Sequence, residues 1–262
     1  MGPELHSRTE TMFQSGIDLA EKLLSQVKSV AASDPEEFAY KGAMLFFFCK
    51  AYKSFQATQL LWREGFEEDA LVLVRTIFEL ALQAQYMYED PKPRARLFTE
   101  HDPVTRYRYY LKLKSLNERE MLGRIEVRSD ELEELKAYYE SLRGKYPGKN
   151  WWGNSIEWLA EQLGKHTETR YTAIYWMQSN LVHSGVTSFR KYLAEQNGGL
   201  KIRCHPSPAT EILVPQEAAL WFIGIMKHAS DALGVSMDAD LEQALKRCWP
   251  TQEAGRQAAS SE

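Results

Sequence analysis

Arg75 and Glu79 are the residues whose types and spacing first suggest a site. They lie one helical turn apart in the segment 70–88, ALVLVRTIFELALQAQYMY. On a helical wheel the two share a side, and nearly all of the surrounding positions are apolar. A charge inside an apolar helix is costly unless it is paired and hydrogen-bonded. We therefore expect an ion pair inside the core, and the groups that converge on it form the best candidate site.

A second polar set lies on the segment 170–183, RYTAIYWMQSNLVH. His183 ends this segment and shares a stripe with Ser179 and Thr172, while the opposite stripe is apolar. A protonated imidazole is favoured at a helix C-terminus by the helix dipole. His183 therefore either satisfies terminal carbonyls or faces the first pair across a pocket, as an acid/base or a ligand contact.

The shared candidate site is Arg75, Glu79, Ser179 and His183, and each part also has a structural interpretation. An Arg–Glu pair with this spacing is common on helix surfaces and contributes little there. Among apolar neighbours it can instead be a structural ion pair that fixes how helices pack. Because buried polar groups need partners, we expect the Arg75–Glu79 side to face the stripe that carries Thr172, Ser179 and His183.

The elements that would position these residues are helical. The pattern predicts an all-α fold, a multi-helix bundle of about eight or nine helices with one small β-hairpin near residues 200–214. An interruption is expected at Pro103, inside the fourth helix. The expected helices are 5–31, 36–63, 70–88, 94–116, 118–143, 156–164, 167–183, 215–232 and 238–248.

Composition sets further limits. The chain has 262 residues, 44% of them hydrophobic, and a net charge of −4. We expect a single helical domain over 1–250 and a flexible tail over 251–262. Because the chain has no net positive charge, binding to nucleic acid would need a local patch of basic residues. The charges at positions 75 and 79 argue against a membrane span. Three distant cysteines and no secretory signal favour the cytoplasm, and neither a cofactor nor a metal is expected.

Two short motifs resemble a widespread bacterial helical family of unknown function. They are Arg75-x-x-x-Glu79 and the helix end Ser179-x-x-Val182-His183, and the resemblance covers about residues 43–232. The family implies a helical fold and brings no established activity.

The helical layout is also distantly similar to HEPN domains, which are often dimeric and occur in toxins and phage-defence nucleases. Active members place an Arg and a His four to six residues apart on one helix. His183 could match that histidine, with Arg75 contributed by a neighbouring helix. Arg96 and His101 have this Arg–His spacing within one predicted helix. The segment lacks the polar residue that follows the arginine in active HEPN domains, and it lies beside Pro103.

Two functions of different class follow. In the first, the chain is a non-catalytic helical binding or scaffold module of a bacterial system, in phage defence or toxin–antitoxin biology, with the polar residues structural. In the second, it is a HEPN-like, metal-independent ribonuclease that uses Arg75 and His183. An RNA or protein partner and a homodimer are expected from the same comparison, and no membrane partner.

Overall fold

The computed structural model describes residues 3–27, 29–116, 129–142, 144, 150–175, 192–196, 199–202, 205–206 and 213–248. The helices are α1 (Pro3–Gln26), α2 (Pro35–Arg63), α3 (Glu67–Glu89), α4 (Pro91–Ser115), α6 (Ser129–Leu142), α7 (Ile156–Gln162), α8 (Lys165–Arg170), the π-helix η1 (Tyr171–Tyr175), α11 (Leu213–Leu233) and α12 (Asp238–Cys248). The strands are β1 (Leu193–Gln196) and β2 (Gly199–Ile202). The all-α fold with a small hairpin is confirmed.

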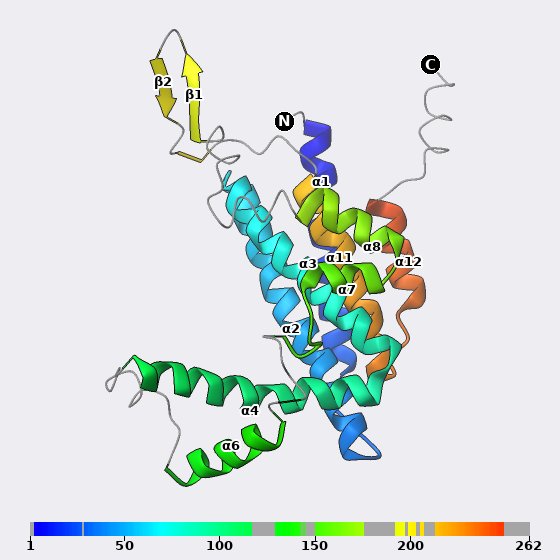
Figure 1. The fold of residues 1–262 in the computed structure, drawn as a ribbon. Coiled ribbons are helices and arrows are strands. Elements are labelled where there is room, and N and C mark those ends of the chain that lie inside the picture. The colour runs from blue at the N-terminus through cyan, green and yellow to red at the C-terminus, as the bar shows by residue number, and fades with distance from the viewer. Residues whose placement is uncertain are drawn as a thin grey trace.

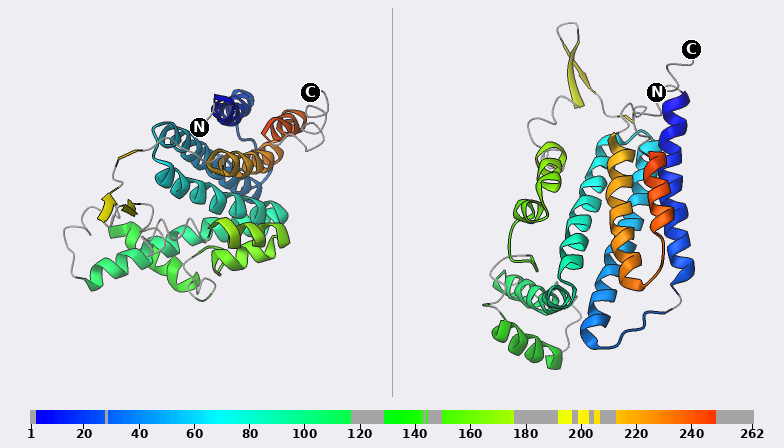
Figure 2. Two further views of the ribbon diagram at one scale, coloured as in Figure 1. Left: turned by 90° about the horizontal axis from the view of Figure 1, so that it is seen from above. Right: turned by 90° about the vertical axis from the view of Figure 1, so that its right-hand side faces the viewer.

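The bundle is built around α2, α3 and α11, which pack on one another pairwise (Figure 1). Helices α1 and α12 cover the α11 side, and α7 and α8 lie over α3 on the opposite side (Figure 2). No residue of α3 between Ala70 and Met87 is exposed, so this helix is enclosed around its circumference, as its apolar sequence predicts.

Aromatic rings fill the centre of the bundle. The fully buried ring of Phe222, on α11, lies 4.7 Å from the ring of Phe55 and 6.1 Å from that of Phe48, both on α2. Phe13 on α1 packs 5.4 Å from Phe55 on the other side. Rings at these separations bury large apolar areas and gain further from their mutual orientation. The core therefore joins the consecutive helices α1 and α2 to α11, which comes near the other end of the described chain.

Gly16, in α1, allows the close approach of α1 to the ring of Phe55. A Cβ atom built at Gly16 would lie 2.6 Å from Cε1 of Phe55, well inside van der Waals contact. We expect Gly16→Ala to lower the free energy of unfolding by about 1–3 kcal/mol, because overpacking outweighs the better helix propensity of alanine. Gly42→Ala on α2 is the matched control, since nothing lies within 4 Å of its added Cβ. The control should gain about 0.5–1 kcal/mol in urea denaturation; equal stability of the two variants would contradict the contact.

Two helices begin with a side-chain cap. The Asp34 carboxylate caps α2 by accepting a hydrogen bond from the Glu37 amide at 2.7 Å, and Pro35 occupies the first turn. Ser155 caps α7 in the same way, accepting from the Trp158 amide at 3.1 Å. At the end of α2, Gly65 adopts a φ of 81°, the left-handed conformation that favours glycine, and stops the helix.

Helices α4 and α6 form an arm that projects from the bundle (Figure 2). The expected interruption at Pro103 is wrong, because α4 continues through it to Ser115. Proline removes one backbone hydrogen bond from a helix. The next residues, Val104 and Tyr107, are buried, so packing of this turn offsets that loss. The first part of α4 lies against α2, and α6 packs along α4.

The hairpin lies earlier in the chain than expected. Its strands pair antiparallel from Leu193 with Ile202 to Gln196 with Gly199, whereas 200–214 was the expected range. Leu213 and Val214 are helical, because they open α11. The sequence between the paired ends is Asn197-Gly198, the dipeptide most typical of a two-residue hairpin connection. The expected tail, 251–262, lies outside the described residues.

Among the residues described, no helix has the length and apolarity needed to cross a membrane.

Candidate functional site

Arg75, Glu79 and Tyr175 form a closed hydrogen-bonded ring between α3 and η1. Arg75 Nε donates to Glu79 Oε1 at 3.0 Å, and Arg75 Nη2 donates to the Tyr175 hydroxyl at 2.7 Å. That hydroxyl in turn donates to Glu79 Oε1 at 2.8 Å. One carboxylate oxygen therefore receives both the guanidinium and the phenol, so the predicted ion pair carries a third member from another helix.

The tyrosine in this ring stays protonated at neutral pH. Burial raises the pKa of Tyr175, and its hydrogen bond to the Glu79 carboxylate raises it further. The Arg75 guanidinium lies 4.5 Å from the centre of the Tyr175 ring, which adds a cation–π contact. Tyr175 therefore acts as a donor that orients the Glu79 carboxylate. Its hydrogen bonds to Arg75 and Glu79 hold η1 on α3.

The hydrogen-bonded ring of Arg75, Glu79 and Tyr175 lies at the edge of the core, whereas the sequence predicts an ion pair inside the core. The side chain of Arg75 is 17% exposed and that of Glu79 is 35% exposed. In the described structure Tyr175 of η1 is the residue that bonds to the pair on this face of α3, and its single side chain leaves part of the Glu79 carboxylate exposed. Water therefore reaches the carboxylate, which reduces the cost of keeping it charged.

A second ion pair lies at the other end of the same segment. Arg170, the last residue of α8, forms a salt bridge with Glu217 of α11, whose side chain is only 3% exposed. The other oxygen of Glu217 accepts a hydrogen bond from Trp221 Nε1 at 3.0 Å. Burial raises the pKa of Glu217, and Arg170 opposes that rise. This pair is the more deeply buried of the two.

Phe78 connects the two polar groups. Its ring centre lies 5.7 Å from that of Tyr175 and 4.7 Å, edge-on, from that of Trp221. The segment 165–175 is therefore fastened to α11 through Arg170 and to α3 through Tyr175, with an aromatic wall between. The polar side chains of Arg75, Glu79, Tyr175, Arg170 and Glu217 all have partners within the protein, as expected of groups that fix how helices pack.

Tyr175 is not among the predicted site residues, because those residues were placed on a regular α-helix. Thr172, expected on the site-facing stripe, is exposed, and its hydroxyl donates to the Glu168 carbonyl at 3.0 Å. The residues Tyr171–Tyr175 are π-helical, and successive side chains within this wider turn depart from uniform 100° steps. Tyr175 thereby reaches α3. Ser179 and His183 lie outside the described residues, so their expected place beside Arg75 stays a prediction.

Glu217 and Trp221 were also missed, although a signal was present. Both share the apolar stripe of α11 with Val214, so the wheel places an acid on a buried face. An acidic residue near the start of a helix is usually explained by its favourable interaction with the helix dipole. That explanation gives no reason to expect a buried ion pair. Its partner, Arg170, carries no comparable signal, because it lies in a short and polar helix.

The literal Arg96–His101 match does not form a joint site. Arg96 donates to Glu100 Oε1 at 2.7 Å, whereas His101 Nδ1 lies 3.2 Å from the Thr105 hydroxyl. Five residues along an α-helix turn a side chain by about 140°, so the two residues point to different sides of α4.

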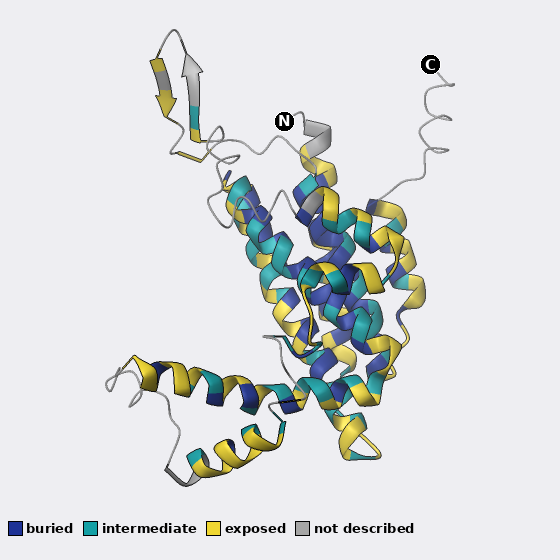
Figure 3. Cartoon of the chain, viewed as in Figure 1, coloured by how far each residue is buried: buried dark blue, intermediate teal, exposed yellow. Residues whose placement is uncertain are grey.

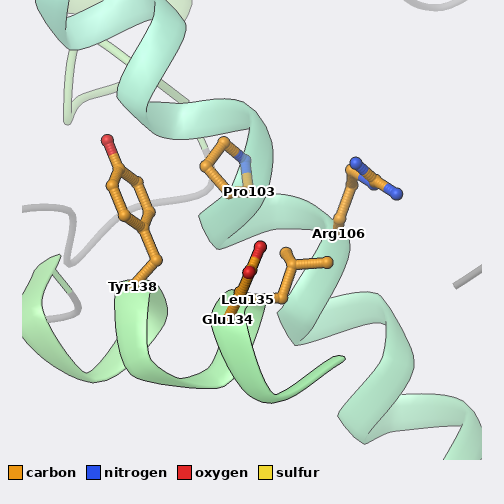
Figure 4. A pocket seen from close by; sticks show the side chains of 5 residues that line it. All are labelled: Pro103, Arg106, Glu134, Leu135 and Tyr138. Carbon is orange, nitrogen blue, oxygen red and sulfur yellow. The ribbon is translucent and has the colours of Figure 1, made fainter. Parts of the chain in front are cut away.

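A pocket of about 290 Å³ lies between α4 and α6 (Figure 4). Its lining residues are Pro103, Arg106, Glu134, Leu135 and Tyr138. This volume falls just below the usual range for drug-sized ligands, about 300–1,000 Å³, and suits a single large side chain.

Metal ligands do not gather in the part of the chain that the structure describes, where no three His, Cys, Asp or Glu side chains could hold an ion.

A scan of protein families matches residues 41–200 to the family of unknown function DUF5677. The matched segment covers well over half of the sequence. The chain belongs to DUF5677. The DUF5677 segment begins in α2 and reaches β2, so it contains the Arg75–Glu79–Tyr175 ring and the whole α4–α6 arm. It ends before α11, and thus before Glu217, and is shorter than the expected range 43–232. No curated protein and no solved structure matches the chain.

Proposed function

We propose that this DUF5677 protein is a non-catalytic helical binding or scaffold module. The observation that carries the proposal is the closed ring of Arg75, Glu79 and Tyr175, in which each member bonds to the other two. A general acid or base needs a pKa near the working pH and access to the substrate proton. Tyr175 has a raised pKa, and its hydroxyl proton is directed at a carboxylate of its own protein.

The surface that would do the binding is α6 together with the part of α4 after Pro103, since these residues project beyond the helices that form the core. Large apolar side chains are exposed on the arm, among them Tyr109 and Leu116, which are 51% and 55% exposed. The bacterial defence or toxin–antitoxin setting implied by the likeness to HEPN domains is part of this proposal.

The competing proposal is a metal-independent ribonuclease that uses Arg75 and His183. It would require Arg75 to stabilise the charge that develops on a scissile phosphate. In the described structure Arg75 donates to Glu79 and Tyr175, which hold its guanidinium within the protein. Recruiting it to RNA would break these bonds, so the geometry favours the binding module.

A structural role for the ring predicts a loss of stability. We expect Arg75→Ala to lower the free energy of unfolding by about 2–3 kcal/mol, because Glu79 and Tyr175 each lose a charged partner in a half-buried place. The matched control is Lys246→Ala, which breaks a pair with Glu242 of the same i,i+4 spacing whose side chains are 72% and 66% exposed. The control should change stability by less than about 0.5 kcal/mol in urea denaturation.

A cleavage assay in EDTA separates the two functions. Wild-type protein is incubated with fluorescent single-stranded RNA, beside Arg75→Lys and His183→Ala, and each variant is also melted by circular dichroism. The binding module predicts no cleavage by wild type. Cleavage that both variants abolish while they melt as wild type does would overturn the proposal in favour of the ribonuclease.

A further inference from the structure

The outward side of α2 forms an exposed ridge with little charge. Six positions on this side are separated by four, three, four, three and four residues, and all six are exposed. At about 100° per residue they fall within about 80° of the helix circumference. They are Gly42, Phe46, Cys49, Lys53, Gln56 and Leu60, called the α2 seam below. Phe46 is 47% exposed and Leu60 is 61% exposed, so large apolar side chains face water in both halves of the seam (exposed residues are yellow in Figure 3).

The spacing of the α2 seam suits a second helix. Alternating separations of four and three residues are those of the a and d positions of a heptad repeat, which place side chains in a line that faces a partner helix. The opposite side of α2 is occupied, since it contains the buried Phe47 and Phe55 and packs on α3 and α11. At 1.5 Å per residue the seam is about 27 Å long, so a helix of about five turns would cover it.

Two features of the seam favour the close approach of such a helix. Nothing lies within 4 Å of a Cβ atom built at Gly42, so a large side chain of a partner has room there. Phe98 of α4 borders the seam, with its ring centre 5.9 Å from that of Phe46, and extends its apolar area. A helix along the seam would therefore bury aromatic rings from both α2 and α4.

The charges of α2 determine which kind of helix fits. No acidic residue occurs between positions 38 and 63, whereas Lys53 lies in the seam and Lys50 beside it. The other cations of this span, Lys41 and Arg63, form salt bridges within the protein. In the part of the chain that the structure describes, Lys50 and Lys53 form none. A helix that covers Lys53 must supply an acid, because a cation enclosed without a partner is costly.

The same charges disfavour a second copy of α2 as the occupant. Two seams in contact would bring Lys50 and Lys53 of both chains to one interface, with no acid from either seam. Like charges that face each other across an interface weaken it. The partner is therefore expected to differ from this chain in the sign of its charge.

We propose that the α2 seam binds an acidic amphipathic helix of another protein. Apolar side chains of that helix lie over Gly42, Phe46 and Leu60, and one of its carboxylates pairs with Lys53. This surface is separate from the α4–α6 arm, so the inference goes beyond the proposed function and adds a second binding surface to it.

Two synthetic helical peptides, each about five turns long, test the proposal on the full-length protein. Both carry Leu at the a and d positions of a heptad repeat; one has Glu at the e and g positions, and the other has Lys there. In fluorescence anisotropy the acidic peptide should bind at least about 10-fold more tightly than the basic one, and Lys50→Glu/Lys53→Glu should reverse this preference.

Uncharged substitutions test the apolar part of the contact. Phe46→Ser and Leu60→Ser should each weaken binding of the acidic peptide by about 30-fold, as expected for large side chains at the centre of an interface. Tyr109→Ser/Leu116→Ser, the same change at exposed positions of α4, is the matched control and should leave binding unchanged. Circular dichroism verifies that every variant is folded.

Cys49 reports where the peptide binds, because this exposed cysteine lies in the seam between Phe46 and Lys53. Acidic peptide at about ten times its Kd should slow alkylation of Cys49 by about 10-fold, measured by mass spectrometry of the digested protein. A protein that binds neither peptide overturns the proposal, as does binding that is indifferent to peptide charge, survives both serine substitutions or leaves Cys49 reactive. Self-association that Phe46→Ser abolishes would overturn it in favour of a second copy.

Discussion

Arg170→Ala is expected to lower the free energy of unfolding by about 3–5 kcal/mol at pH 7, more than any loss at the Arg75 ring. The substitution leaves the Glu217 carboxylate, whose side chain is 3% exposed, without its cationic partner. Removing one member of a buried pair strands an uncompensated charge, which is the costly case for ion pairs. Chemical denaturation of wild type and variant measures the difference.

The pH dependence identifies the cause. The pKa of Glu217 is raised in the folded protein, so the native state holds this proton more tightly than the unfolded chain does. The group's contribution to stability is therefore fully present below the unfolded pKa of about 4.3 and is lost as pH rises through the folded pKa. Without Arg170 that folded pKa rises further, so the deficit of the variant should shrink between pH 7 and pH 5.

A second substitution controls for lost packing. Arg170→Ala combined with Glu217→Gln keeps an acceptor for Trp221 Nε1 and removes the charge, so it should recover most of the deficit at pH 7. A deficit that is the same at pH 5 and pH 7 and is unaffected by Glu217→Gln would show that the salt bridge is not its source.

Phe222→Ala is expected to cost about 3–5 kcal/mol, because the ring is fully buried where three helices meet and its removal leaves a cavity. The rings of Phe48, Tyr52 and Phe55 all lie within 6.1 Å of it, and such close packing limits collapse into the space. Leu60→Ala, at a position 61% exposed on α2, is the control and should change stability by less than about 0.5 kcal/mol. Urea denaturation measures the free energy of unfolding of both variants. A similar loss in the two would contradict the central place of Phe222 in the core.

Much of the fold could be predicted because its signals are local. The apolar circumference of 70–88 identifies α3 as an enclosed helix, and the Asp34-Pro35 start and Gly65 stop bound α2 within a residue or two. The bounds of α12 agree with those expected, 238–248. In each case one periodic pattern and one terminating residue determine the element.

The site could be predicted only in part because its geometry depends on departures from regularity. The wheel pairs Arg75 with Glu79 correctly, since both lie on one regular helix. It cannot find Tyr175, which reaches them through the π-helical turn of η1. Nor can it join Arg170 to Glu217, because 47 residues separate them and only tertiary packing brings them together.

The position of α11 also shows that the DUF5677 segment contains only part of the core. That segment, 41–200, supplies α2 and α3, but α11 packs on both of them and carries Phe222 into the aromatic centre. A fragment cut at the family boundaries would have its largest apolar faces open to water. The unit recognised by sequence similarity is therefore smaller than the packed core, and α1, α11 and α12 supply the rest of that core.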